Sequence, residues 1–164
     1  MTADAPRLSC RGLALSVAGR MLVSSLDLDV RAGECWVVIG PNGAGKTTLM
    51  TALAGLRAAQ AGAIAYDGTP LTALGLRERA RRRGFLPQDS VDHFPASVLE
   101  TALVGRHPHL SRWQWESAAD IDRARAALST FGLAGLDDRD ARTLSGGERR
   151  RLALAALVAQ DSGL

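Results

Sequence analysis

The segment "GPNGAGKTT" combines residue types that bind phosphate groups, at the spacing G-x-x-x-x-G-K-[ST]. Gly40, Gly43 and Gly45 let the backbone turn tightly and direct successive N–H groups at anionic oxygens. Lys46 would reach the β and γ phosphates of a nucleotide, and Thr47 would offer its hydroxyl to Mg²⁺. We therefore predict a phosphate-binding loop made of Gly40, Pro41, Asn42, Gly43, Ala44, Gly45, Lys46, Thr47 and Thr48.

The charge composition draws attention to Lys46, which is the only lysine among the 20 Lys and Arg residues of a chain with net charge +3. Lys is a compact charge on a thin stem, whereas Arg is a planar fork, so a narrow site wrapped by backbone favours Lys. The glycine spacing does not match the dinucleotide pattern G-x-G-x-x-G. The alternative is a glycine-rich turn with an incidental lysine, and the flanking elements argue against it.

A phosphate loop needs a strand before it and a helix after it. The run "ECWVVIG" (Glu34–Gly40) is continuously apolar, which predicts a strand buried on both faces. "KTTLMTALAG" has helical spacing, which predicts a helix with Gly55 as its C-terminal cap. Further strands are predicted at Leu26–Val30, at "GAIAYDG" and at "GFLPQ" (Gly84–Gln88).

The second half of the chain has helical patterns. Ser97 and Glu100 form a capping box, and Gly105 is expected to close the helix that follows. "DIDRARAALSTFGL" predicts an amphipathic helix whose apolar face holds Ile121, Ala124, Leu128 and Phe131.

The segment "LSGGE" is a second candidate anion site. Ser145 and Glu148 make another capping box, so Gly146 and Gly147 lie in a first helical turn with uncovered N–H groups. Arginines at 149–151 oppose the helix dipole there, so helix stability does not explain them. A simple helix cap with a solvated basic face remains the alternative.

Together, "GPNGAGKTT", "LPQ" and "LSGGE" in this order resemble the ATP-binding-cassette (ABC) ATPases, from about Leu8 to the last residue. The resemblance implies an α/β fold: a P-loop NTPase core with an N-terminal antiparallel β subdomain and an α-helical insert. It implies one partial domain over residues 1–164, made of a β-rich part with the phosphate loop (1–88), a helical subdomain (89–143), and the signature motif with its helix (144–164).

In that family two ATPase subunits face each other head to tail, and each ATP lies between one subunit's phosphate loop and the other's signature. The resemblance implies that residues 40–48 bind ATP in cis, and that Thr47 and Gln88 contact Mg²⁺ and the surroundings of the attacking water. Ser145, Gly146 and Gly147 would hold the γ phosphate of the partner's ATP. The implied cofactors are ATP and Mg²⁺, and the implied partner is a second copy of the ATPase subunit.

The segment "FPASVLETALVGRHPHL" (Phe94–Leu110) is similar to importer subunits for iron–siderophore, haem and cobalamin. Such subunits dock on an integral-membrane permease, which implies a cytoplasmic protein at the inner face of the plasma membrane. Trp113 and Trp115 are either interface anchors or core residues. His107 and His109 lack a third metal ligand and are expected to be surface or packing groups.

The run "RERARRR" (Arg77–Arg83) raises a rival class, a nucleic-acid- or ribosome-associated ATPase. Glu78 interrupts the run, and no aromatic residue is interleaved. The insert is short and has no heptad run, unlike the coiled coils of chromosome and repair cassettes. We therefore expect a solvated helix here and no nucleic-acid partner.

The sequence departs from the family at the adenine site and at the catalytic strand. No aromatic residue lies near Val17, where the family usually stacks adenine, so phosphate contacts are expected to dominate affinity. Hydrolysis needs one carboxylate for Mg²⁺ and a second to orient water. No apolar strand ending in Asp-Glu and no switch histidine follows Leu144; Asp161 lies in a turn, and Asp89 and Asp92 fall outside the expected site.

We therefore expect that the chain is incomplete at its C-terminus, with unpaired sheet edges, and that alone it is a non-catalytic or non-functional fragment. The purified 164-residue chain should be marginally stable or aggregate, and should release no phosphate from Mg-ATP above background. Lys46→Ala is the control. Turnover that Lys46→Ala abolishes would contradict this prediction.

Overall fold

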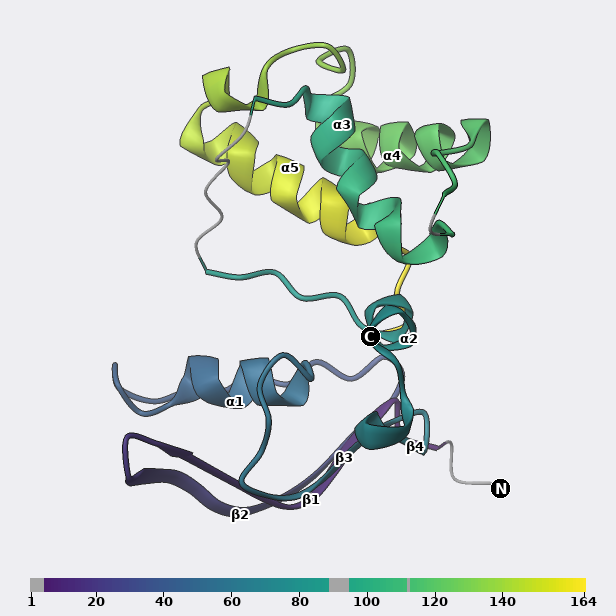
Figure 1. The fold of residues 1–164 in the computed structure, drawn as a ribbon. Helices are drawn as coiled ribbons and strands as arrows, with labels where there is room; N and C mark the ends of the chain where they lie inside the picture. The colour runs from purple at the N-terminus through teal and green to yellow at the C-terminus, as the bar shows by residue number, and fades with distance from the viewer. Residues whose placement is uncertain (1–4, 89–94, 112) are drawn as a thin grey trace. The chain divides into compact units, whose positions relative to one another are not determined.

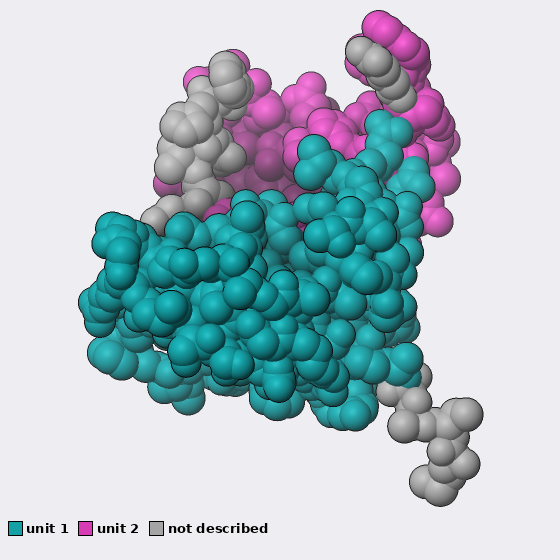
Figure 2. All heavy atoms as spheres, turned by 60° about the horizontal axis from the view of Figure 1, so that its bottom comes forward, with its two compact units in different colours: residues 1–82, 164 teal, residues 83–163 magenta. Residues whose placement is uncertain are grey.

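The computed structural model describes residues 5–88, 95–111 and 113–164. The chain forms two compact units, shown in different colours in Figure 2: unit 1, residues 1–82 with 164, and unit 2, residues 83–163. Within the described ranges, no helix has the length and apolar character needed to cross a membrane.

Unit 1 is built on a four-stranded antiparallel sheet (Figure 1). Its strands are β1 (Leu8–Val17), β2 (Arg20–Val30), β3 (Ala61–Tyr66) and β4 (Thr69–Pro70), in the order β2-β1-β3-β4. The expected strands at 26–30 and in "GAIAYDG" are confirmed as the end of β2 and as β3.

Two-residue turns with positive φ join β1 to β2 and β3 to β4. Ala18 and Gly19 connect β1 to β2 with φ of 49° and 79°, and Asp67 and Gly68 connect β3 to β4 with φ of 46° and 74°. Such turns match the right-handed twist of paired strands, so they set the hairpin registers locally.

Helix α1 (Lys46–Leu53) packs against the sheet, and its Ala52 and Leu53 share a buried core with strand residues such as Leu15 and Tyr66. The Tyr66 hydroxyl donates a hydrogen bond of 2.6 Å to the Leu53 carbonyl, which ties the end of α1 to β3. Gly55 follows the helix with φ of 66°, as expected of a C-terminal glycine. A 3₁₀ turn (Leu71–Ala73) and helix α2 (Leu76–Arg82) complete the unit.

The expected strands at 34–40 and 84–88 are wrong: neither segment has strand structure. Instead of being buried, Val37 is 72% exposed and Ile39 is 88% exposed. A parallel strand takes its hydrogen bonds from strands on either side, and none of the described strands pairs with these segments. The prediction of strands at 34–40 and 84–88 rested on their apolar residues alone. A strand conformation also needs neighbouring strands to pair with.

Unit 2 is helical, with α3 (Val98–Leu103), α4 (Ala118–Thr130) and α5 (Gly146–Ala159) around one apolar core (Figure 1). Short 3₁₀ segments at Val104–His109 and Ala141–Thr143 join them. The expected apolar face of α4 is confirmed, since Ala124 and Leu128 are buried and Ile121 and Phe131 pack beside them. Residues 83–88, grouped by the sequence with the phosphate loop, belong to this unit.

Capping boxes begin all three helices of unit 2. Those of Ser97 with Glu100 and Ser145 with Glu148 confirm the sequence prediction. A third, Ser117 with Asp120, was missed although "SAAD" has the required spacing. Each box satisfies backbone groups that a helix start would otherwise leave unpaired.

The expectation that Gly105 closes α3 is wrong. The chain continues into the 3₁₀ segment 104–109, and Gly105 lies against α5, where a Cβ would collide with the Ala156 carbonyl. Its role is to permit close backbone approach, which the helix pattern could not reveal.

The two tryptophans after this segment are not core residues. Trp113 and Trp115 are 89% and 87% exposed, so the alternative that they pack in the core is wrong.

A buried ion pair and a hydrogen bond join the 3₁₀ segment Val104–His109 to α4 and α5. Arg106 and Asp120 are 4% and 6% exposed, and the Arg106 Nε donates to the Asp120 carboxylate at 2.9 Å. The Arg106 Nη1 donates to the Ala159 carbonyl at the end of α5 at 2.8 Å. Hydrogen bonds from the Ser117 hydroxyl, then from Arg106, lower the pKa of Asp120 to about 2.

Replacing Asp120 by Asn should lower the free energy of unfolding by about 3 kcal/mol or more, because Arg106 stays buried without its counter-charge. The folded pKa of Asp120, about 2, lies below the unfolded value, so this stabilisation is present above about pH 4 and is lost as pH falls through about 2. Urea unfolding at several pH values measures both effects. Exposed Asp122→Asn is the control, and equal acid sensitivity in the wild type and Asp120→Asn would contradict the prediction.

Candidate nucleotide-binding site

The predicted phosphate loop forms a tight turn between the exposed segment 34–39 and α1. Gly43 and Gly45 have φ of 79° and 93°, the left-handed region that glycine enters without strain. The Ala44 N–H donates to the Pro41 carbonyl at 3.2 Å, which closes the turn. The two glycines therefore adopt the backbone conformation that the sequence pattern predicted.

The N-terminus of α1 is left open toward this loop. Its N-cap residue is Gly45, no side chain forms a cap hydrogen bond, and no acidic residue lies in the first turn. The first N–H groups of a helix have no partner within the helix, and the helix dipole is positive there. This end of α1 is thus suited to an anion.

The Lys46 ammonium lies against the loop itself. Its Nζ donates to the carbonyls of Gly40 and Pro41, both at 2.8 Å. An ammonium has three N–H donors, so one remains for a ligand. Lys46 forms no ion pair with a carboxylate among the described residues, so its positive charge is not neutralised by them.

Strand β2 positions the loop through Leu22. A Cβ at Gly45 would lie 2.9 Å from the Leu22 Cδ1 atom. Gly45 is therefore required both by its φ and by the close approach of the sheet. Thr47 lies two residues after Gly45 and is exposed, as a ligand of Mg²⁺ would need to be.

The signature segment begins α5 in unit 2. The Ser145 N–H donates to the Glu148 carboxylate at 2.8 Å, and the Glu148 N–H donates to the Ser145 Oγ at 3.3 Å. Hydrogen bonds from the Ser145 side chain and backbone lower the pKa of Glu148. Gly146 is open, since a Cβ there would meet no atom within 4 Å, and Gly147 faces only the end of the Arg151 side chain.

Gln88 is exposed at the end of segment 83–88, in unit 2. The Arg150 Nη1 donates to the carbonyls of Pro87 and Gln88, at 3.3 and 3.5 Å. Of the arginines at 149–151, Arg150 therefore has a hydrogen-bonding partner within unit 2. Neither an anion site nor a solvated basic face predicts this contact. Asp89, Asp92 and Phe94 lie outside the described residues.

The sequence-predicted residues fall into two groups. Residues 40–48 belong to unit 1, whereas Gln88 and Ser145–Gly147 belong to unit 2, where Arg150 joins the Gln88 backbone to α5. Val17 ends β1 and is 38% exposed. In the described residues no group of three His, Cys, Asp or Glu side chains is placed to hold a metal.

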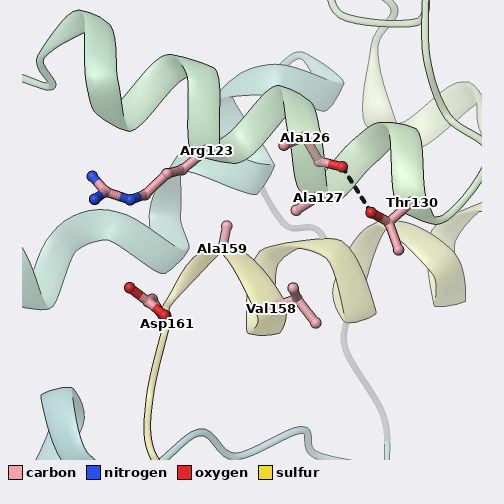
Figure 3. Close-up of a pocket in the computed structure, with 7 residues that line it drawn as sticks. All are labelled: Arg123, Ala126, Ala127, Thr130, Val158, Ala159 and Asp161. Atoms are coloured by element: carbon pink, nitrogen blue, oxygen red, sulfur yellow. Dashed lines mark hydrogen bonds between the residues drawn. The ribbon is translucent and has the colours of Figure 1, made fainter.

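A groove between α4 and the end of α5 contains Asp161 (Figure 3). The cavity, of about 240 Å³, is lined by Arg123, Ala126, Ala127, Thr130, Val158, Ala159 and Asp161. The Thr130 hydroxyl is already donated to the Ala126 carbonyl at 2.9 Å. Asp161 lies in the turn after α5 with φ of 54°, as expected. It lines this groove together with three alanines.

A family model described as ABC transporter matches residues 23–164. The chain belongs to the ABC transporter family. Its fold agrees with that assignment: the structure of an inward-facing, metal-chelate type ABC transporter superimposes with a TM-score of 0.79 at 28% identity, covering 95% of this chain and 56% of the other.

Two curated relatives of this ABC protein are importer subunits by name. The hemin import ATP-binding protein HmuV of Myxococcus xanthus is 43% identical over 155 residues, covering 94% of this chain and 57% of the relative. The cobalamin import ATP-binding protein BtuD of Halobacterium salinarum is 38% identical over 154 residues, covering 93% of this chain and 38% of the relative. The chain thus spans 38% to 57% of these relatives' lengths.

Gly45→Ala should disrupt the loop, because Ala is strained at positive φ and its Cβ would press on Leu22. We expect about 1–3 kcal/mol of local destabilisation and loss of detectable Mg-ATP binding by calorimetry. Gly75→Ala is the matched control, since a Cβ at Gly75 meets open space. Equal ATP affinity in the two variants would contradict the structural role assigned to Gly45.

Proposed function

We propose that this chain is the nucleotide-binding portion of an ABC importer subunit that couples ATP to uptake of haem, cobalamin or iron–siderophore complexes. The observation that carries the nucleotide part is the uncapped N-terminus of α1, with the Lys46 ammonium held against the loop by the Gly40 and Pro41 carbonyls. The names of the hemin and cobalamin relatives support the class of cargo.

The residues present suit a triphosphate with Mg²⁺. Backbone N–H groups of Gly43 and of residues 45–47 would join the Lys46 ammonium in binding anionic oxygens, and no carboxylate competes in the first turn of α1. The Ala44 N–H is already donated to the Pro41 carbonyl. The exposed Thr47 hydroxyl would bind Mg²⁺, and Gln88, which is also exposed, would be a second Mg²⁺ ligand. Mg²⁺ neutralises phosphate charge when bound. The chain's own residues bind and orient the nucleotide.

The second anion site supports a head-to-tail homodimer. Ser145, Gly146 and Gly147 begin α5 with open backbone and would hold the γ phosphate of the partner's ATP. A ligand that contacts both subunits stabilises the closed pair by its differential affinity for that state. Transmission of closure to an integral-membrane permease places the subunit at the cytoplasmic face of the plasma membrane.

The rival class, a nucleic-acid-associated ATPase, gains no support from α2. The Arg79 Nε donates to the Leu74 carbonyl at 2.9 Å, and Arg82 bonds to the Tyr66 carbonyl and to Glu78. These two arginines thus stabilise unit 1 itself. Intramolecular packing explains part of the basic run without a polyanion.

Calorimetric titration of the folded chain with Mg-ATP tests the proposal. We expect weak binding at millimolar ATP, and at least a roughly tenfold loss in Lys46→Ala, because a charge-assisted hydrogen bond to phosphate contributes about 1.5–3 kcal/mol. Arg31→Ala, an exposed charge removed at the end of β2, is the control. A flat titration of folded wild-type protein would sink the proposal.

A further inference from the structure

Segment 83–88 runs along α5 in the opposite direction to the helix. At one end, the Gln160 Nε2 donates to the Arg83 carbonyl at 2.8 Å. At the other end, the Arg150 Nη1 donates to the carbonyls of Pro87 and Gln88, at 3.3 and 3.5 Å. The order of contacts along the segment is therefore the reverse of their order along α5.

A close packing contact lies near the Arg83 end of this segment. A Cβ at Gly84 would press on the side chain of Leu157, so the backbone there lies directly on the helix. From Arg150 to Gln160 a helix rises about 15 Å at 1.5 Å per residue, and five extended residues span about 17 Å. The two lengths agree, so residues 83–88 are held extended along α5 with little slack.

The position of Arg150 would otherwise be unfavourable. A cation in the first turns of a helix opposes the helix dipole. Arg150 is exposed, so packing in the core does not explain an arginine at this position. Pro87 and Gln88 lie outside helix and strand, so their carbonyls have no partner in a helix or a sheet. The Arg150 guanidinium is the donor that these carbonyls accept from within unit 2.

We propose that Arg150 is a positioning residue that holds the Gln88 backbone to the signature helix. The inference deepens the proposed function and rests on it for the role of Gln88 in Mg²⁺ binding. Arg150 follows Ser145–Gly147 by about one helical turn. The helix that would contact the partner's nucleotide therefore also fixes the backbone of the residue that would contact Mg²⁺.

NMR of the backbone carbonyl carbons tests the contact without any nucleotide. In Arg150→Ala the ¹³C carbonyl resonances of Pro87 and Gln88 should shift upfield, because each carbonyl loses the guanidinium N–H that it accepts. Carbonyl resonances of α5 beyond the first turn and the thermal midpoint should not change. Arg149→Ala removes a neighbouring exposed arginine and should leave the two resonances in place, whereas Arg150→Lys, which keeps a charged donor, should retain most of the downfield shift.

The dependence of ATP affinity on Mg²⁺ distinguishes positioning from a merely structural contact. Arg150→Ala should reduce the gain in affinity that Mg²⁺ produces, as Gln88→Ala should, and the double variant should lose no more than Gln88→Ala. Affinity for Mg²⁺-free ATP should be unchanged in all three.

The outcomes separate the two proposals. Unchanged carbonyl resonances of Pro87 and Gln88 in Arg150→Ala overturn the inference, and so does a shift of these resonances with an unaltered Mg²⁺ gain. ATP affinity that is the same in Lys46→Ala as in the wild type instead overturns the proposed function, while the carbonyl resonances still decide whether Arg150 holds the segment.

Discussion

Close packing at a glycine is a constraint that recurs in both units of the chain. Gly45 brings the predicted phosphate loop against the Leu22 side chain of β2, and Gly105 brings the 3₁₀ segment against the Ala156 carbonyl of α5. At each place an added Cβ would require a neighbour to shift, because packed interiors leave little room for another carbon atom. The candidate anion site in unit 1 therefore depends on a glycine for its packing as well as for its backbone torsion.

The N-termini of the helices differ in whether a side chain caps them. Helices α3, α4 and α5 all begin with a serine whose side chain and partner carboxylate complete a capping box. Helix α1 begins with glycine and has no such cap. A local cap would occupy the N–H groups that a phosphate needs, so its absence at α1 leaves the helix start free for the ligand. At α5 the box uses the Glu148 N–H and leaves the backbone around Gly146 open.

Sequence patterns succeeded where the determining contacts are local. The left-handed torsions of Gly43 and Gly45, the boxes at Ser97 and Ser145, and the amphipathic α4 all follow from interactions between residues a few positions apart. They failed where a pattern depends on distant partners. The apolar run 34–40 was expected to be a buried strand, yet it is exposed because no described strand pairs with it.

The sequence by itself determined the chemistry of the loop, since glycine torsions, the Lys46 ammonium and helix polarity act within a few residues of one another. Tertiary structure alone decided that Arg106 is buried against Asp120, that Arg150 holds the Gln88 backbone, and that Gly105 is a packing contact. Arg150 and Gln88 are separated by 62 positions in the chain. Periodicity records which face of an element is apolar, but the partner that covers that face is specified only when the chain folds.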